Sequence, residues 1–164
     1  MTDRDTEYRV LLSRWLKGNP SAIAFIEMVC QIAHTCDDLT DQDTNVEVSQ
    51  IQDTFWKALI ELPRNSFYVE SFALLNGTVQ MAFLNWKIAN QLERTNAAQA
   101  QEVAFILRSS YIDLVTLSAW IIGVTDWACQ VGEEARLETS QEGLDAYRMS
   151  LTKERRGSHV VMVP

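Results

Sequence analysis

The sequence predicts an all-α protein, and three observations lead to this fold class. Apolar residues recur at spacings of three and four through most of the chain, which is the pattern of amphipathic helices. The alternating pattern of strands is almost missing. The 164 residues include only six glycines and three prolines, and 47% of them are hydrophobic. A chain of this length and composition can bury one sizeable core, so we expect a single-domain bundle of five to six helices.

A glycine and a proline separate the first two predicted helices. Gly18 ends a helix over residues 3–17, and Asn19 followed by Pro20 is typical of an N-cap and a first helical residue. The second helix then runs to about residue 41. The inward faces are expected to consist of Tyr8, Leu11, Leu12 and Trp15 in the first helix and of Ile23, Ile26, Val29, Cys30 and Ala33 in the second.

Two capping boxes and a proline delimit further helices. Thr44-x-x-Glu47 predicts the start of a third helix that ends at Pro63, and a fourth helix covers about residues 66–93. Thr139-x-x-Glu142 predicts a last, short helix with Tyr147 among its aligned apolar residues. The expected inward residues are Ile51, Phe55, Ala58, Leu59 and Leu62 in the third helix and Phe72, Leu75, Val79, Phe83, Trp86 and Ala89 in the fourth.

The other long helix is expected over about residues 97–137. At 1.5 Å per residue it would be roughly 60 Å long, so we expect a kink near Gly123 or Gly132. No linker or internal repeat divides the sequence, and residues 1–154 are therefore predicted to form one helical domain. Residues 155–164 are predicted to be a loosely held C-terminal tail.

The charge balance and the apolar segments exclude some classes of function. With 14 basic and 22 acidic side chains the formal net charge is −8, which argues against direct binding of a nucleic-acid backbone. The N-terminus has no apolar signal core, and the apolar stretch 114–125 is shorter than the roughly 20 residues that cross a bilayer. Three cysteines without a CxxC pair are typical of buried thiols in a reducing compartment. We therefore expect a cytoplasmic protein without a membrane span.

Carboxylates are concentrated in two apolar segments that lack basic residues. One segment lies between Gly18 and Trp56 and the other between Ser109 and Ala135. Asp37 and Asp41 continue the inward stripe of the second helix. Because an unpaired buried carboxylate is costly, these side chains either emerge at the end of the bundle or hold a cation. Asp113 is expected to be buried and paired with Arg108 or with a polar group of the fourth helix.

The stretch Asp37-Asp38-Leu39-Thr40-Asp41 contains the spelling DDxxD, which resembles the aspartate-rich motif of the class I isoprenoid (terpenoid) synthases. In that all-α family the aspartates hold magnesium against a substrate diphosphate, and a second motif on a facing helix completes the metal site. Asp126, Gln130 and Glu134 match the spacing of that motif, although Gln130 stands where the family has a hydroxyl residue. The resemblance also implies basic side chains that bind the diphosphate, and the candidates are Lys87, Arg94 and Arg108.

A second resemblance is to the all-α nucleotide pyrophosphatases of the MazG type. Their EExxE cluster is similar to residues 37–41, but aspartate replaces glutamate here and their ExxD motif has no good copy. Both resemblances imply Mg²⁺ that is bound by carboxylates and neutralises a diphosphate. Cys30, His34 and Asp38 share one side of the second helix, but a single histidine on an apolar helix is more typical of a core residue, so no zinc is expected. No signal indicates haem, flavin or a nucleotide cofactor.

Two functions follow from this pattern. The first is a Mg²⁺-dependent enzyme that acts on a diphosphate-containing small molecule, either as an isoprenoid-synthase-like lyase or transferase or as a pyrophosphatase, with residues 37–41 facing residues 126–134. The second is a noncatalytic acidic helical interaction protein, such as an inhibitor, a nucleic-acid mimic or an assembly factor, that binds a basic protein. The aromatic faces also fit a homo-oligomer. The two functions differ in whether the acidic segments meet around a cation.

Overall fold

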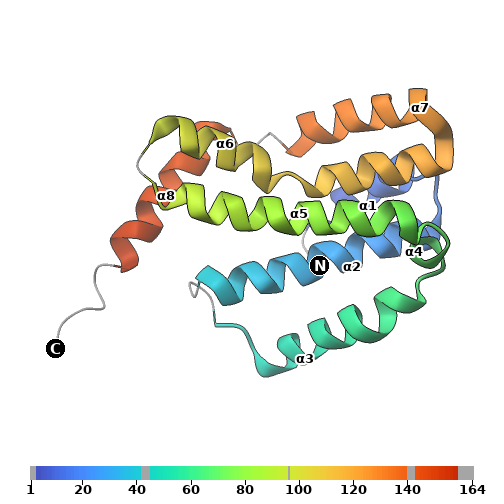
Figure 1. Cartoon of the computed structure of the whole chain (residues 1–164), viewed down its shortest axis with the longest axis horizontal. Coiled ribbons are helices and arrows are strands. Elements are labelled where there is room, and N and C mark those ends of the chain that lie inside the picture. The colour runs from blue at the N-terminus through green and yellow to red at the C-terminus, as the bar shows by residue number, and fades with distance from the viewer. Residues whose placement is uncertain (1–2, 42–44, 96, 140–142, 159–164) are drawn as a thin grey trace.

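The computed structural model describes residues 3–41, 45–95, 97–139 and 143–158. The chain is 89% helical and the described residues contain no strand, so the predicted all-α bundle is confirmed (Figure 1). The elements in chain order are α1 (Asp3–Trp15), α2 (Pro20–Asp41), α3 (Val48–Trp56), the π-helical turn η1 (Lys57–Glu61), the 3₁₀ turn η2 (Leu62–Arg64), α4 (Ser66–Glu70), α5 (Phe72–Glu93), α6 (Ala98–Arg108), α7 (Tyr111–Thr139) and α8 (Leu144–Ser158).

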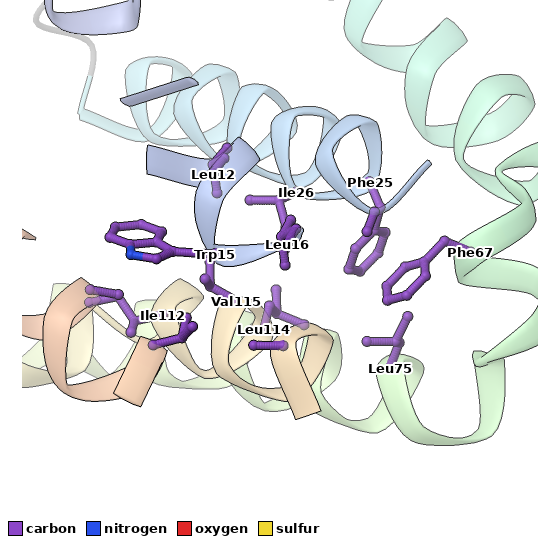
Figure 2. Close-up of a cluster of buried hydrophobic side chains, with 14 of the residues drawn as sticks. Leu12, Trp15, Leu16, Phe25, Ile26, Phe67, Leu75, Ile112, Leu114 and Val115 are labelled. Carbon is purple, nitrogen blue, oxygen red and sulfur yellow. The ribbon is translucent and has the colours of Figure 1, made fainter. Parts of the chain in front are cut away.

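The core lies where α1, α2, α4, α5 and α7 meet (Figure 2). Trp15 of α1 and Phe25 of α2 are the largest fully buried side chains, and the Phe25 ring stacks on Tyr68 with centroids 5.4 Å apart. Burial of such side chains contributes roughly 1.5–3 kcal/mol each, and this term holds the bundle together. Other buried members of the cluster are Leu12, Leu16, Ala22, Ile26, Phe67, Leu75, Ile112, Leu114, Val115, Ala119, Val131 and Ala135.

Local signals explain several helix boundaries. Gly18 has φ 68° and its N–H donates to the Ser13 carbonyl at 2.7 Å, which ends α1 as predicted. Asn19 Oδ1 accepts a hydrogen bond from the Ala22 N–H at 3.0 Å and so caps α2, again as predicted. Asn65 caps α4 in the same way, through Tyr68 N–H at 2.9 Å. Both predicted capping boxes include positions outside the described residues.

The long helix predicted near residues 97–137 is present but bent. It is interrupted at residues 109–110, between α6 and α7, and again at Val124, whose φ of 61° and ψ of −171° are not helical. The predicted kink near Gly123 is therefore confirmed at the next residue. After Val124 the chain turns back, so that the second arm of α7 runs along the first (Figure 1). An ion pair between Asp113 and Arg136 joins the two arms at 2.5 Å.

The stretch Ala98–Glu138 is long and apolar enough to cross a membrane, judged by length and composition alone. It contains both the interruption at residues 109–110 and the reversal at Val124. The expectation that the chain has no membrane span stays a prediction.

Five apolar side chains do not lie where their periodicity predicts, and the first of them is Ala33 of the second predicted helix, which is exposed. Phe55 and Leu59 of the third predicted helix and Phe72 and Phe83 of the fourth were expected to face inward, but all four are exposed. The third predicted helix is α-helical as far as Trp56 and continues as the π-helical turn η1, which contains Leu59, and the fourth is interrupted at Ser71 between α4 and α5. The difference has two reasons. α3 packs against the bundle mainly through α2, and α5 is apolar on more than one side while its neighbours cover only part of it.

Candidate functional site

A polar cluster lies at the C-terminal end of α2, around Asp37. Arg108, the last residue of α6, donates through Nη1 to Asp37 Oδ1 at 2.6 Å. Trp86 of α5 donates through Nε1 to the same oxygen at 2.7 Å. One oxygen of a predicted metal ligand is therefore occupied by two N–H donors.

Glu93 is the second carboxylate of this cluster, and it is 8% exposed. The Arg108 guanidinium forms a bidentate pair with Glu93, in which Nε donates to Oε1 and Nη2 donates to Oε2, both at 2.7 Å. The Tyr147 hydroxyl of α8 also donates to Glu93 Oε1. Planar pairs of this kind are the strong form of the arginine–carboxylate interaction, so both oxygens of Glu93 are held by donors from within the protein.

The electrostatics of the cluster follow from burial and from these contacts. Burial alone would lower the pKa of Arg108, but the hydrogen bonds and charge of Glu93, and then those of Asp37, raise it above its ordinary value. Burial raises the pKa of Tyr147, and its hydrogen bond to Glu93 raises it further. Both shifts favour a cationic Arg108 and a neutral Tyr147 within the cluster. The cluster joins α2, α5, α6 and α8.

The second predicted metal motif lies in different surroundings, on the returning arm of α7. Glu134 forms an ion pair with Arg14 of α1 and accepts a hydrogen bond from Trp15 Nε1 at 3.0 Å. Asp126 and Gln130 are exposed. A shallow hollow of about 450 Å³ lies here, and its lining residues are Arg14, Trp127, Gln130, Glu133, Glu134 and Leu137.

The contacts do not bring the two acidic motifs together. Asp37 contacts α5 and α6, whereas Glu134 contacts α1. Among the described residues no three carboxylate, histidine or cysteine side chains are grouped so as to hold a metal ion. Asp38 is half-buried, and the side chain of Asp41 lies outside the described part. The set of six expected ligands is thus not assembled as one site in the residues that can be placed.

Of the three predicted diphosphate-binding residues, Arg108 contacts a predicted metal ligand, and no contact of Lys87 or Arg94 with one is observed in the described part of the chain. Arg108 contacts Asp37, as a shared metal and diphosphate site requires. Its guanidinium, however, forms ion pairs with both Asp37 and Glu93. Lys87 and Arg94 are exposed, and the Lys87 ammonium lies 6.0 Å from the centre of the Phe83 ring. Asp113 was expected to be buried and to pair with Arg108 or with the fourth helix. It is instead half-exposed and paired with Arg136, because the reversal at Val124 brings that arginine alongside.

Two of the three cysteines, Cys30 and Cys36, are partly buried. Burial raises the pKa of Cys30 to about 11, and burial followed by the charge of Asp37 raises the pKa of Cys36. Cys129 is exposed. A raised thiol pKa makes the thiolate that nucleophilic and metal-binding chemistry needs scarce at neutral pH, so Cys30 is a poor candidate for either role.

Sequence reasoning missed Glu93 and Tyr147 and assigned Trp86 only to the core. The signal for two of them was present, because positions 86 and 93 are seven residues apart and share a face of α5. Nothing in the sequence linked that face to Arg108 or to Tyr147, since the cluster is assembled from four separate helices.

Among the described residues, exposed apolar side chains gather along α3 and η1 and along α5. The α3–η1 surface consists of Val48, Phe55, Trp56 and Leu59, whose exposed fractions lie between 57% and 67%, and no residue of α3 or η1 is buried. The α5 stripe consists of Leu74, Met81, Leu84 and Ile88, with exposed fractions between 41% and 53%. Large apolar patches on a protein surface are typical of interaction sites.

In comparisons with known proteins, no family model, no curated protein and no solved structure matches this chain. The resemblances to isoprenoid synthases and to MazG-type pyrophosphatases stay predictions that depend on the quoted residues alone.

Proposed function

We propose that the chain is a noncatalytic helical interaction protein that binds a basic, amphipathic segment of another protein. The observation that carries this proposal is the α3–η1 surface. Val48, Phe55 and Leu59 are seven and four residues apart, so they form one outward stripe of the helix, and Trp56 lies beside them.

The weak packing of α3 supports the proposal that a partner covers the α3–η1 surface. The helix has nine residues, which is too short to be stable in water without packing, and none of them is buried. Its polar link to the bundle is a hydrogen bond of 3.0 Å between Thr54 and the buried Thr35 of α2. A partner that covers Phe55 and Leu59 would bury apolar side chains that now face water, and each is worth roughly 1.5–3 kcal/mol when fully buried.

Charge supports a basic partner. Glu47, Asp53 and Glu61 are exposed along this segment, where Lys57 is the one basic residue between positions 47 and 61. The net charge of the chain is −8, which attracts cationic segments over longer range. Two of the predicted metal ligands are engaged in ion pairs within the protein, Asp37 with Arg108 and Glu134 with Arg14.

A model peptide tests the proposal without knowledge of the natural partner. The probe is a labelled amphipathic peptide of leucine and lysine, compared with the same peptide in which glutamate replaces every lysine. Fluorescence anisotropy should show binding of the basic peptide only, and this binding should weaken as salt increases. The double variant Phe55→Ala/Leu59→Ala should bind it at least tenfold more weakly.

Leu137→Ala is the matched control, because Leu137 is as exposed as Leu59 but belongs to α7. It should leave the affinity unchanged, and circular dichroism should show that all variants stay folded. Equal binding of both peptides, no binding of the basic peptide, or unchanged binding by the double variant would overturn the proposal.

The second candidate is the Mg²⁺-dependent enzyme, and two observations favour it. A predicted metal ligand, Asp37, and a predicted diphosphate-binding residue, Arg108, lie in contact. Asn90 is on the same face of α5 as Trp86 and Glu93, and its Oδ1 is buried without a hydrogen-bond partner among the described residues. Thermal denaturation with Mg²⁺ and pyrophosphate together should then raise Tm above that with either alone, and Asp37→Asn should remove the increase. If Tm does not respond to the pair, this candidate is wrong.

A further inference from the structure

The α5 stripe has the spacing of a helix–helix seam. Leu74, Met81, Leu84 and Ile88 follow one another at intervals of seven, three and four residues, which is the a/d pattern of a coiled coil. Side chains at these positions lie within one narrow sector of the helix surface. α5 has 22 residues and is therefore about 33 Å long, enough for several turns of contact with another helix.

The stripe is a second apolar face of α5, separate from the one that enters the bundle. Leu75 and Ala89 are fully buried against the core, and Trp86 contacts Asp37 of α2. A helix that is apolar on both sides is normally covered on both. In this chain α6 and α7 pack along α5, yet the four stripe residues still expose about half of their surface.

The charges along α5 indicate which partner helix fits. The end of α4 that precedes it bears Glu70, and no basic residue occurs from Asn65 to Trp86. The other end bears Lys87 and Arg94, both exposed. A second copy of this helix in parallel orientation would place like charges together. In the antiparallel orientation, Arg94 of each copy lies near Glu70 of the other copy.

We propose that the chain forms a two-fold symmetric dimer in which α5 packs antiparallel against α5 of a second copy, with Met81 at the symmetry axis. Leu74 and Ile88 are each seven residues from Met81. Leu74 of each copy therefore lies opposite Ile88 of the other copy. Both apolar and charged positions are then complementary under one two-fold rotation. This interface is distinct from the α3–η1 surface and does not depend on the proposed function.

Cysteine cross-linking tests the register directly. In a Cys129→Ser background, which removes the exposed thiol, Met81→Cys should form a covalent dimer on mild oxidation because the two thiols meet at the axis. Cys30 and Cys36 interfere little, since burial raises the pKa of both thiols. Val10→Cys is the control, as Val10 is somewhat more exposed than Met81 but lies on α1. It should cross-link slowly or not at all.

Leu74→Cys distinguishes the two orientations. In an antiparallel pair, the two copies of position 74 are 14 residues apart along the axis, or about 21 Å, and cannot form a disulfide. A mixture of the Leu74→Cys and Ile88→Cys proteins should instead give the mixed dimer. Self-cross-linking of Leu74→Cys, or cross-linking of Met81→Cys no faster than of Val10→Cys, would overturn the proposal.

Solution mass gives a second, independent readout. Light scattering should report a dimer for the unmodified chain and a monomer for Met81→Glu, while Leu137→Glu stays dimeric. Glu70→Arg should weaken the dimer at least several-fold, and the double variant Glu70→Arg/Arg94→Glu should restore it. A monomer at all concentrations up to the millimolar range, or no restoration by the charge exchange, contradicts the antiparallel pairing.

Discussion

The replacement Gly123→Ala tests how the reversal of α7 is held. Gly123 lies at the end of the first arm, one residue before Val124. A Cβ atom at this position would lie 2.5 Å from Cδ1 of Trp127 and 2.9 Å from Nζ of Lys17. Helix propensity alone predicts that alanine stabilises the protein by about 1 kcal/mol. The structure predicts the opposite sign, because a contact of 2.5 Å forces the indole ring to move.

The size of the effect follows from what Trp127 loses. Its Nε1 donates to the Trp15 carbonyl at 2.9 Å, and loss of such a bond costs about 1 kcal/mol. The Lys17 ammonium lies 4.8 Å from the centre of the ring, a cation–π contact worth about 0.5–1 kcal/mol. Overpacking adds about 1–3 kcal/mol. After the gain in propensity is subtracted, Gly123→Ala should destabilise the protein by roughly 1.5–4 kcal/mol.

Urea denaturation followed by tryptophan fluorescence measures this difference, and Gly77→Ala is the matched control. Gly77 is inside α5, and a Cβ atom there would meet nothing within 4 Å. The control should therefore stabilise the protein by about 0.5–1 kcal/mol, as propensity predicts. If Gly123→Ala stabilises the protein as much as the control does, the packing of Trp127 against Gly123 is not what holds the turn.

Three further predictions concern the turn, the polar cluster and the thiols. Val124→Gly should raise the free energy of unfolding by about 1 kcal/mol, because a β-branched residue at φ 61° is strained while glycine is not; an unchanged urea midpoint would contradict the strain. Arg108→Leu should lower the free energy of unfolding by about 3 kcal/mol, because the buried Glu93 loses its ion-pair partner. A decrease of under 1 kcal/mol in urea denaturation would show that water replaces the guanidinium. Stability should fall between pH 9 and about 11, because the unfolded chain releases the Cys30 proton near 9.0 whereas the folded chain holds it to about 11. Denaturation across this pH range should show a smaller decrease for Cys30→Ala, and an equal decrease would assign the effect to other groups.

The sequence by itself determined the all-α fold class and several of the helix ends. Their positions follow from local signals, namely the spacing of apolar residues, Gly18 at the end of α1, and Asn19 with Pro20 at the start of α2. The buried face of α1 was also predicted, whereas in α2 the prediction included the buried Ile26 but missed Ala22 and Phe25. Such information lies within a few residues along the chain, and the physics of a helix is local on the same scale.

Only the tertiary structure decided what the polar and aromatic side chains contact. Arg108 and Asp37 are 71 residues apart in the sequence, and Arg14 and Glu134 are 120 apart, so no periodicity links either pair. The reversal at Val124 sets the partner of Asp113, and it depends on the fit of Trp127 against Gly123. For Phe55 and Phe83 the helical phase was known, but exposure depends on which neighbouring helix lies alongside. A carboxylate or an aromatic ring becomes a ligand, a core residue or an interface residue through its neighbours in space, and helix packing alone sets those neighbours.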